Sequence, residues 1–345
     1  MISRTYFLIQ FTILLLFQNL PAQTNLSIGQ RFAVIIGGIG GQQAFTDKYY
    51  GQTSRMYDIL VDSLHYPREN VYFLFEDPSY DSLNINYKAT AVNVAKVFGK
   101  LRKTMQAGDQ LFLFLVGHGT FDGNWSKFNL VGPDLRDIDF ARLVDQLPTQ
   151  KIIVVNTASA SGPFVKKMSG KQRIIITATK NGYENYETTF ADFFIDATLK
   201  KEADVNKDHH ISMLEAFNYA KVGQDAWFVE KRRLRPEHPL LDDNGDGVGV
   251  QTVRNRGDGQ LARTVYLEPV APDLKASLRR IKAGTQSPLD SLKLKRFQLS
   301  QEIERLKAQK EQMPSKEYSK KLETLLIQLA RVNKRIRETT SGNQP

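Results

Sequence analysis

The side chain in this sequence that is best placed for chemistry is His118, which stands between two glycines. It directly follows residues 110–117 (QLFLFLVG), an apolar run that is typical of a buried strand. An imidazole titrates near neutral pH and can act as a general base, although a lone histidine is more often a structural residue. Because the flanking glycines leave the ring poorly packed, we expect His118 to face a cleft.

The chain has 345 residues and no cysteine. That absence excludes disulfides, thiolate metal sites, a cysteine nucleophile and a lipid-modified cysteine anchor. Hydrophobic residues make up 41% and charged residues 24% of the chain, a globular composition that leaves ample material for a core. The formal net charge of +10 favours an acidic partner only if the basic residues gather in one place.

Short apolar runs that alternate with helical patterns predict the fold. The runs read as buried strands and cover residues 31–38, 70–76, 110–117, 151–156 and 173–178. Helical patterns between them include residues 57–64, 91–101 and 139–147. This alternation implies parallel pairing, so the sequence predicts an α/β fold, a three-layer sandwich with a mostly parallel sheet. Ligands of such sheets bind beyond the carboxyl ends of the strands, which points to residues 37–41, 117–119 and 156–162.

Two of these strand ends resemble the motifs of the legumain-type cysteine peptidases, within the wider caspase–hemoglobinase fold. In that family a hydrophobic strand runs into His-Gly, as LFLFLVGHG does here. The next core strand ends in an acidic residue, a small residue, the nucleophilic cysteine and a small turn, and VVNTASASG stands in that place. The resemblance covers residues 31–222 and implies a caspase-like fold with a peptidase cleft.

Carried over residue by residue, the resemblance makes His118 the general base and lets Gly119 contribute to an oxyanion hole. Asn156 takes the place of the acidic residue, and Ala158 takes the place of the cysteine. Alanine has no nucleophilic group. A shift of the turn by one residue would bring Ser159 into reach, but a serine hydroxyl is far less acidic than a thiol and needs a well-aligned base.

This departure leaves two hypotheses. In the first, the protein is a pseudo-peptidase that has lost the thiol, keeps the cleft and binds a peptide or protein there. In the second, it is an active endopeptidase that uses Ser159 with His118 as base. A third group usually orients such a base, and Asp122 is the nearest acid along the chain. The absent cysteine favours the first hypothesis.

The resemblance also implies a pocket in which a basic residue receives an acidic or Asn side chain of the substrate. Lys48 and Glu187 stand at positions that match pocket residues of the family, so we predict that both bind substrate. The alternative is that both are solvated loop charges.

Residues 204–215 (DVNKDHHISMLE) have the ligand spacing of an EF-hand calcium loop. The candidate ligands are Asp204, Asn206, Asp208, His210 through its carbonyl group, Ser212 and Glu215. His209 stands where a glycine normally makes the turn. The alternative is a polar loop that caps the following helix. A shorter repeat with Asp242, Asn244 and Asp246 is either a second calcium loop or a tight turn. We predict calcium as a structural ion.

Residues 1–22 have the features of a signal peptide. Arg4 gives a positive start, residues 6–17 form an apolar run too short for a typical membrane span, and Ala22 precedes a plausible cleavage point. An uncleaved anchor is the alternative. Export without cysteines predicts a periplasmic or secreted protein that has no transmembrane span in its mature form.

The C-terminal part differs in composition. We assign residues 23–253 to the α/β domain, residues 254–286 to a linker rich in Gly, Arg and Pro, and residues 287–340 to a helical hairpin. The hairpin follows from apolar residues at steps of three and four on both sides of Pro314, which predict two antiparallel, coiled-coil-like helices.

From Ala271 onward there are 17 Lys and Arg against 8 Asp and Glu, so most of the net charge lies here. These basic residues either form a solvated surface or dock onto an acidic partner, a membrane surface or a cell-wall polymer. A third hypothesis is therefore an envelope scaffold that acts through the hairpin. No motif for reading bases is visible, and no nucleic-acid partner is expected.

Overall fold

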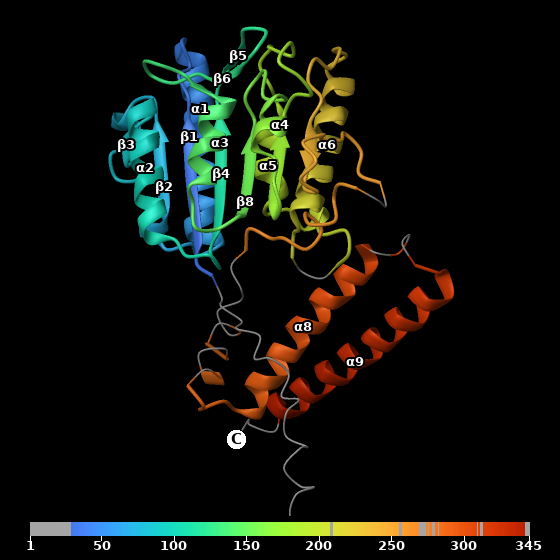
Figure 1. The fold of residues 1–345 in the computed structure, drawn as a ribbon. Coiled ribbons are helices and arrows are strands. Elements are labelled where there is room, and N and C mark those ends of the chain that lie inside the picture. Colours follow the sequence, from blue (N-terminus) through green and yellow to red (C-terminus); the bar gives the residue numbers. More distant parts are fainter. Residues whose placement is uncertain are drawn as a thin grey trace, which may run out of the picture.

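The computed structural model describes residues 29–341 apart from 208–209, 255–256, 269–273, 275, 278–279, 282, 309 and 311–312. In this part of the chain, seven strands form one sheet (Figure 1). Its order is β10 (Leu240–Asp242), β9 (Arg173–Thr177), β8 (Lys151–Asn156), β4 (Gln110–Val116), β1 (Arg31–Gly37), β2 (Val71–Phe75) and β3 (Tyr87–Lys88). Neighbouring strands are parallel except for β10 with β9. The strands predicted from the sequence are confirmed as β1, β2, β4, β8 and β9.

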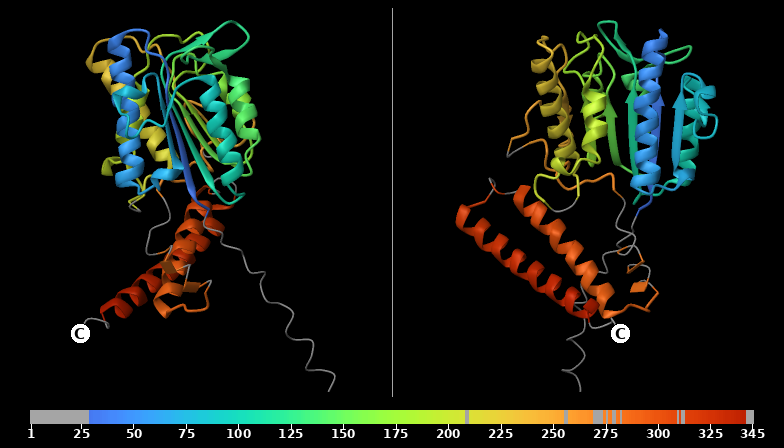
Figure 2. Two further views of the ribbon diagram at one scale, coloured as in Figure 1. Left: turned by 90° about the vertical axis from the view of Figure 1, so that its left-hand side faces the viewer. Right: turned by 180° about the vertical axis from the view of Figure 1, so that it is seen from behind.

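Helices cover both faces of the sheet (Figure 2), which confirms the predicted three-layer α/β architecture. One face carries α1 (Gln43–Asp58), α5 (Phe190–Ala197) and α6 (Met213–Glu230), and the other carries α2 (Ala91–Thr104), α3 (Asp137–Asp145) and α4 (Phe164–Met168). The predicted helix over residues 57–64 is the end of a longer one, because α1 starts at Gln43 and continues into a π-helical turn, Ile59–Ser63. Its start was missed because several of its buried residues are polar, including Gln52 and Thr53.

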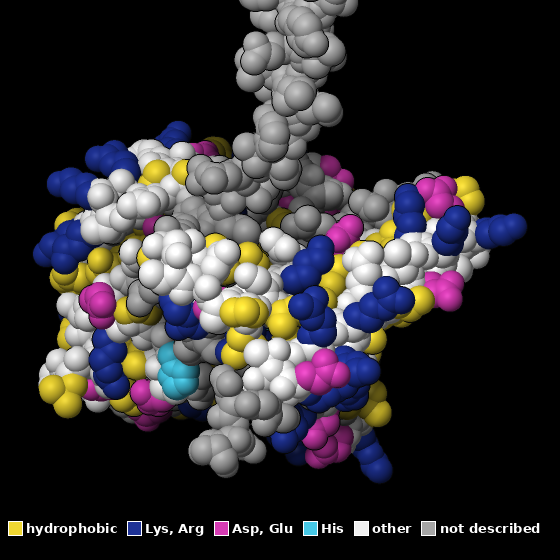
Figure 3. Space-filling view, turned by 90° about the horizontal axis from the view of Figure 1, so that it is seen from below, with side chains coloured by type: hydrophobic (Ala, Val, Ile, Leu, Met, Phe, Trp, Pro, Cys, Tyr) yellow, Lys and Arg dark blue, Asp and Glu magenta, His cyan; other side chains and the backbone are white. Residues whose placement is uncertain are grey.

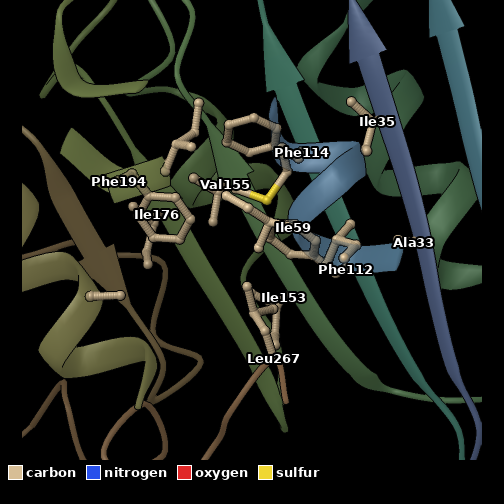
Figure 4. Close-up of a cluster of buried hydrophobic side chains, with 14 of the residues drawn as sticks. Ala33, Ile35, Ile59, Phe112, Phe114, Ile153, Val155, Ile176, Phe194 and Leu267 are labelled. Atoms are coloured by element: carbon tan, nitrogen blue, oxygen red, sulfur yellow. The ribbon is translucent and has the colours of Figure 1, made fainter. Parts of the chain in front are cut away.

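Burial on both faces explains the apolar strand sequences. Every residue of β4 is buried, and successive side chains of a strand point to opposite faces. Phe112 and Phe114 join the cluster under α1 and α5 (Figure 4), whereas Leu111 and Leu113 join the cluster under α2 and α3. Each such side chain contributes about 1.5–3 kcal/mol by leaving water, so β4 is fixed firmly between the layers.

Short elements complete the α/β unit. Directly after β4, β5 (Gly119–Phe121), β6 (Ser126–Phe128) and β7 (Leu135–Arg136) form a small antiparallel sheet. Single turns of 3₁₀ helix occur at Arg68–Asn70, Pro78–Tyr80 and Lys201–Ala203.

The segment after β10 folds back onto the core, although the sequence assigns it to a linker. Ala262 and Leu267 are buried in the cluster that lies under α1, and the Tyr66 hydroxyl donates to the Leu267 carbonyl at 2.9 Å. The Asp243 carboxylate accepts the amide hydrogens of Gly259 and Ala262, both at 2.7 Å. The α/β unit therefore extends to Leu267, and the expected boundary at residue 253 is too early.

The C-terminal helices are α8 (Pro288–Ala308) and α9 (Ser315–Ser341), which run antiparallel as expected (Figure 1). The buried side chains of α8 include Leu292, Leu299, Ile303 and Leu306. The residues of α9 predicted to face it are half-buried, namely Tyr318, Leu322, Leu325, Leu329, Val332 and Ile336. The hairpin lies beyond the end of the sheet where β1 and β4 begin, opposite to β5 and β6.

The predicted signal peptide, residues 1–22, lies outside the described residues, so its cleavage stays a prediction. Across the residues that the structure does describe, none of the helices combines the length and the apolar character needed to cross a membrane.

We predict that Asp243→Ala loosens the segment that follows β10. The substitution leaves the buried amides of Gly259 and Ala262 without their acceptor, which should lower the free energy of unfolding by about 1–3 kcal/mol. Hydrogen exchange read by mass spectrometry should show faster exchange over residues 258–267. Asp246→Ala, in the exposed part of the same turn, is the control. Equal exchange in both variants would contradict this account of the fold.

Candidate functional site

His118 lies at the carboxyl end of β4, where it packs against α1. The imidazole contacts the rings of Phe45 and Tyr49 edge-on, with ring centroids 4.7 and 5.3 Å away. Its Nδ1 lies 3.2 Å from the Tyr49 hydroxyl oxygen. Tyr49, rather than the expected Asp122, is therefore the group that orients the ring.

Asp122 has a different role. Its carboxylate accepts the amide hydrogens of Asn124 and Trp125 and pairs with the Lys127 ammonium at 2.8 Å. These hydrogen bonds and the lysine charge lower its pKa to about 2. Asp122 thus stabilises the turn between β5 and β6.

The surroundings of His118 favour the neutral imidazole. Burial lowers its pKa below the usual value of 6.5, while the nearby Glu187 charge and a backbone interaction with Gly40 oppose that shift and Lys48 adds to it. Burial, reinforced by Glu187, also raises the pKa of Tyr49, so its hydroxyl keeps its proton. At neutral pH the site holds a neutral imidazole beside a neutral phenol.

The turn after β8 lies directly against His118-Gly119. The Ser159 hydroxyl accepts the amide hydrogen of Gly119 at 3.0 Å and donates to the Gly119 carbonyl at 3.1 Å. Ser159 is 2% exposed. A Cβ atom on Gly119 would lie 2.1 Å from the Ser159 carbonyl oxygen, so this approach requires glycine. The amide expected to serve an oxyanion hole is thus already bound within the protein.

Asn156 ends β8 and Ala158 lies in the turn that follows, at the positions that resemble the acidic residue and the cysteine. The Asn156 side-chain oxygen accepts the Ala158 amide hydrogen at 3.1 Å. Ala158 is 1% exposed and belongs to the cluster under α2 and α3, whereas His118 packs on α1 across the sheet. The backbone turns sharply at Ala160, whose φ is 51°.

Lys48 and Glu187, both predicted to bind substrate, come together beside His118. The Lys48 ammonium lies 2.5 Å from the Glu187 carboxylate and 3.3 Å from the Thr188 carbonyl oxygen. Their side chains are 29% and 40% exposed, so a ligand can reach both. In this structure they neutralise each other, and their binding of substrate stays a prediction.

A carboxyl group that the sequence did not single out holds the loop carrying Glu187. Glu237 accepts hydrogen bonds from the Thr189 amide and hydroxyl, both at 2.8 Å, at the start of α5. It is 1% exposed, and its other oxygen has no hydrogen-bond partner in the described part of the chain. Burial raises its pKa to about 7. Glu237 lies in an irregular stretch rich in Pro and Arg, so no pattern could have marked it.

The same loop carries two exposed aromatic side chains. Tyr183 and Tyr186 are 76% and 70% exposed. Tyr183 contacts Phe121 of β5 edge-on, with ring centroids 5.2 Å apart. The Glu184 carboxylate accepts the amide hydrogen of His238 at 3.0 Å, which ties the loop to the segment that contains Glu237. Aromatic, basic and acidic groups therefore meet at this end of the sheet.

The first predicted calcium loop adopts the arrangement of a helix cap. One oxygen of Glu215 accepts the amide hydrogens of Val205 and Asn206. The other accepts both the amide and the hydroxyl hydrogen of Ser212, which begins α6 in a capping box. The His210 ring contacts the Glu268 carboxylate. In this loop Lys207 has a left-handed backbone conformation, with a φ of 60°. Asp208 and His209 lie outside the described residues. Calcium at this loop stays a prediction.

The second loop is closed by its own hydrogen bonds. Asp246 and Asn244 bond reciprocally, and Asp242 accepts the amide hydrogen of Gly245 at 3.3 Å. One oxygen of the buried Asp242 has no hydrogen-bond partner among the described residues, and burial raises its pKa. Within the described ranges, no group of three or more His, Asp or Glu side chains that could hold a metal ion is found. The hydrogen bonds are those of a tight turn, and calcium at this loop stays a prediction.

Comparison with known proteins adds little. No family model matches this chain, and no curated protein matches it. Among solved structures, it is similar to protein GSU0716 from Geobacter sulfurreducens, with 12% identity and a TM-score of 0.40 over 61% of this chain and 92% of that chain. A similarity at this level indicates nothing about function.

We predict that Ser159→Ala lowers the free energy of unfolding by about 1–3 kcal/mol, because the Gly119 amide would be left buried without an acceptor. Denaturant unfolding measures this change. Ser82→Ala, at an exposed position, is the control and should be nearly neutral. A stability of Ser159→Ala equal to wild type would mean that the hydroxyl has no structural role.

Glu237 gives a prediction about pH. Because its pKa of about 7 in the folded protein exceeds the ordinary 4.5, the folded state binds this proton more tightly than the unfolded chain does. The resulting stabilisation is full below the ordinary pKa and is lost as the pH rises through the folded value. It amounts to at most about 3 kcal/mol.

We therefore expect Glu237→Gln, which stays neutral, to gain in stability relative to wild type as the pH rises from about 4 to about 8. Urea unfolding at a series of pH values measures the difference. A constant difference across that range would show that the carboxyl pKa is not raised.

Proposed function

We propose that this protein is a pseudo-peptidase whose cleft, at the carboxyl ends of β4 and β8, binds an extended peptide or protein segment without cleaving it. The resemblance to the legumain-type peptidases supports a cleft that binds peptides. The hydrogen bonds between Ser159 and Gly119 support the loss of catalysis.

The observation that carries the proposal is the hydrogen bonding of the turn after β8. Ala158 occupies the position of the nucleophile, and the neighbouring Ser159 hydroxyl bonds to both backbone groups of Gly119. The His118 ring contacts the Tyr49 hydroxyl and so has a structural partner of its own. Acyl transfer requires a nucleophile within hydrogen-bond reach of its base. Among the described residues, the hydroxyl that reaches the His118 ring is the phenol of Tyr49, whose raised pKa keeps it protonated.

The groups around His118 support binding. An ion pair as exposed as Lys48–Glu187 is worth about 0–1 kcal/mol, so a ligand can displace either partner at little cost. A carboxylate or amide of the bound segment would then accept a hydrogen bond from Lys48. Tyr183 and Tyr186 offer apolar surface beside it. If the chain is exported as we expect, this binding takes place in the periplasm or outside the cell.

An active serine peptidase remains the alternative. It requires Ser159 to leave both hydrogen bonds to Gly119 and to turn toward His118, which breaks the contact between the two strand ends. The test below separates the two functions.

We predict that residues 23–345, with calcium present, cleave no member of a diverse peptide library read by mass spectrometry. His118→Ala is the matched control. Cleavage by the wild-type protein that is absent from His118→Ala would contradict the proposal and establish the serine peptidase.

Peptides from the same library should nevertheless be retained by the immobilised protein. We expect Lys48→Gln to weaken retention about tenfold, the effect of one lost charged hydrogen bond. Lys96→Gln, an exposed lysine of α2, should leave retention unchanged. The absence of retained peptides, or equal retention by both variants, would count against binding at this cleft.

A further inference from the structure

The outer face of α9 carries an apolar patch that the hairpin does not cover. Leu326 and Ile327 are 47% and 44% exposed, and Ala330, one turn further on, is exposed as well. They line a shallow groove together with Ser319, Leu322 and Glu323. The half-buried heptad residues form the seam toward α8, and one of them, Leu322, also borders the groove. The patch therefore belongs to a second face of α9.

Exposed basic side chains lie on α9 both before and after this patch, namely Lys316, Lys320, Arg331, Lys334 and Arg337. Helix positions three, four or seven residues apart share a face, so these cations lie on the same face of α9 as the patch. Two acids accompany them, Glu323 and Glu338, the second of which lies 3.8 Å from Lys334. The outer face keeps a net positive charge over about 30 Å of helix.

We propose that this outer face of α9, centred on Leu326 and Ile327, binds the surface of an anionic phospholipid bilayer. An exposed helix with a few apolar side chains among Lys and Arg has the composition of helices that lie in a membrane interface. Cations near an anionic lipid surface are attracted over about one Debye length, and inserted apolar side chains add to that attraction. This inference is independent of what the proposed site around His118 binds.

A second copy of the chain fits this face less well. A stable protein interface buries about 1,000 Å² or more, far beyond what three apolar residues in one patch supply. Pairing two such faces would also bring two sets of cations together. A bilayer surface requires no matching seam and offers the opposite charge.

The arrangement of the molecule suits this use. The hairpin lies at the end of the sheet opposite to β5 and β6, and Figure 3, viewed from that end, shows Lys and Arg side chains on the exposed surface. A protein attached through α9 would keep the His118 end of the sheet away from the lipid surface, open to solution.

The test is co-sedimentation of residues 23–345 with vesicles, which removes the apolar leader as a source of binding. We expect at least tenfold tighter binding to phosphatidylcholine vesicles that contain about one third phosphatidylglycerol than to phosphatidylcholine alone. We also expect this binding to be lost at high salt. The double variant Leu326→Ser/Ile327→Ser and the double variant Lys334→Gln/Arg337→Gln should each weaken binding about tenfold.

Matched controls come from the α/β unit. Leu83→Ser removes an exposed leucine there, and Lys103→Gln/Lys171→Gln removes two exposed cations. Both should bind vesicles like wild type. Equal binding to the two kinds of vesicle, or equal losses in the test and control variants, overturns the proposal. So does a dimer in light scattering that Leu326→Ser/Ile327→Ser dissociates without any vesicle binding.

Discussion

The burial of β4 on both faces is the constraint on which the rest of this structure depends. A strand packed between two helical layers cannot shift easily, because a slip of one residue would move Phe112 and Phe114 into the space that leucines fill on the other face. The point where β4 leaves the core is therefore fixed, and His118 lies at that point. The neighbouring elements then complete the site. Helix α1 packs against the His118 ring, and β8 places the turn that follows it beside His118-Gly119.

That neighbouring turn is joined to His118-Gly119 by a single buried hydroxyl. In a peptidase of the family that the sequence resembles, the same junction would hold a free nucleophile and a free amide donor. Here Ser159 and Gly119 bond to each other, so both groups stabilise the fold. In the function that we propose, the remaining role is recognition, through the charges of Lys48 and Glu187 and the aromatic rings of Tyr183 and Tyr186.

The sequence predicts those features that local pattern determines. The apolar runs identify the central strands, and the rule that ligands bind at strand ends leads to His118. The partner of its ring, Tyr49, was not predictable, because the first half of α1 has no clear apolar period. The bond from Ser159 to Gly119 and the role of Glu237 depend on segments that meet only in the folded chain, 40 and 48 residues apart in sequence. Residues 254–267 were assigned to a linker because they have no apolar pattern. The Asp243 carboxylate holds them to the core by accepting the amide hydrogens of Gly259 and Ala262.

The function that we propose requires that His118 activate no serine. The most direct measurement is the intact mass of residues 23–345 after treatment with a fluorophosphonate probe, which modifies activated serines, followed by peptide mapping of any adduct. This requirement predicts an unchanged mass for the wild-type protein and for His118→Ala alike. A single adduct on Ser159 in the wild type, absent from His118→Ala, would contradict it.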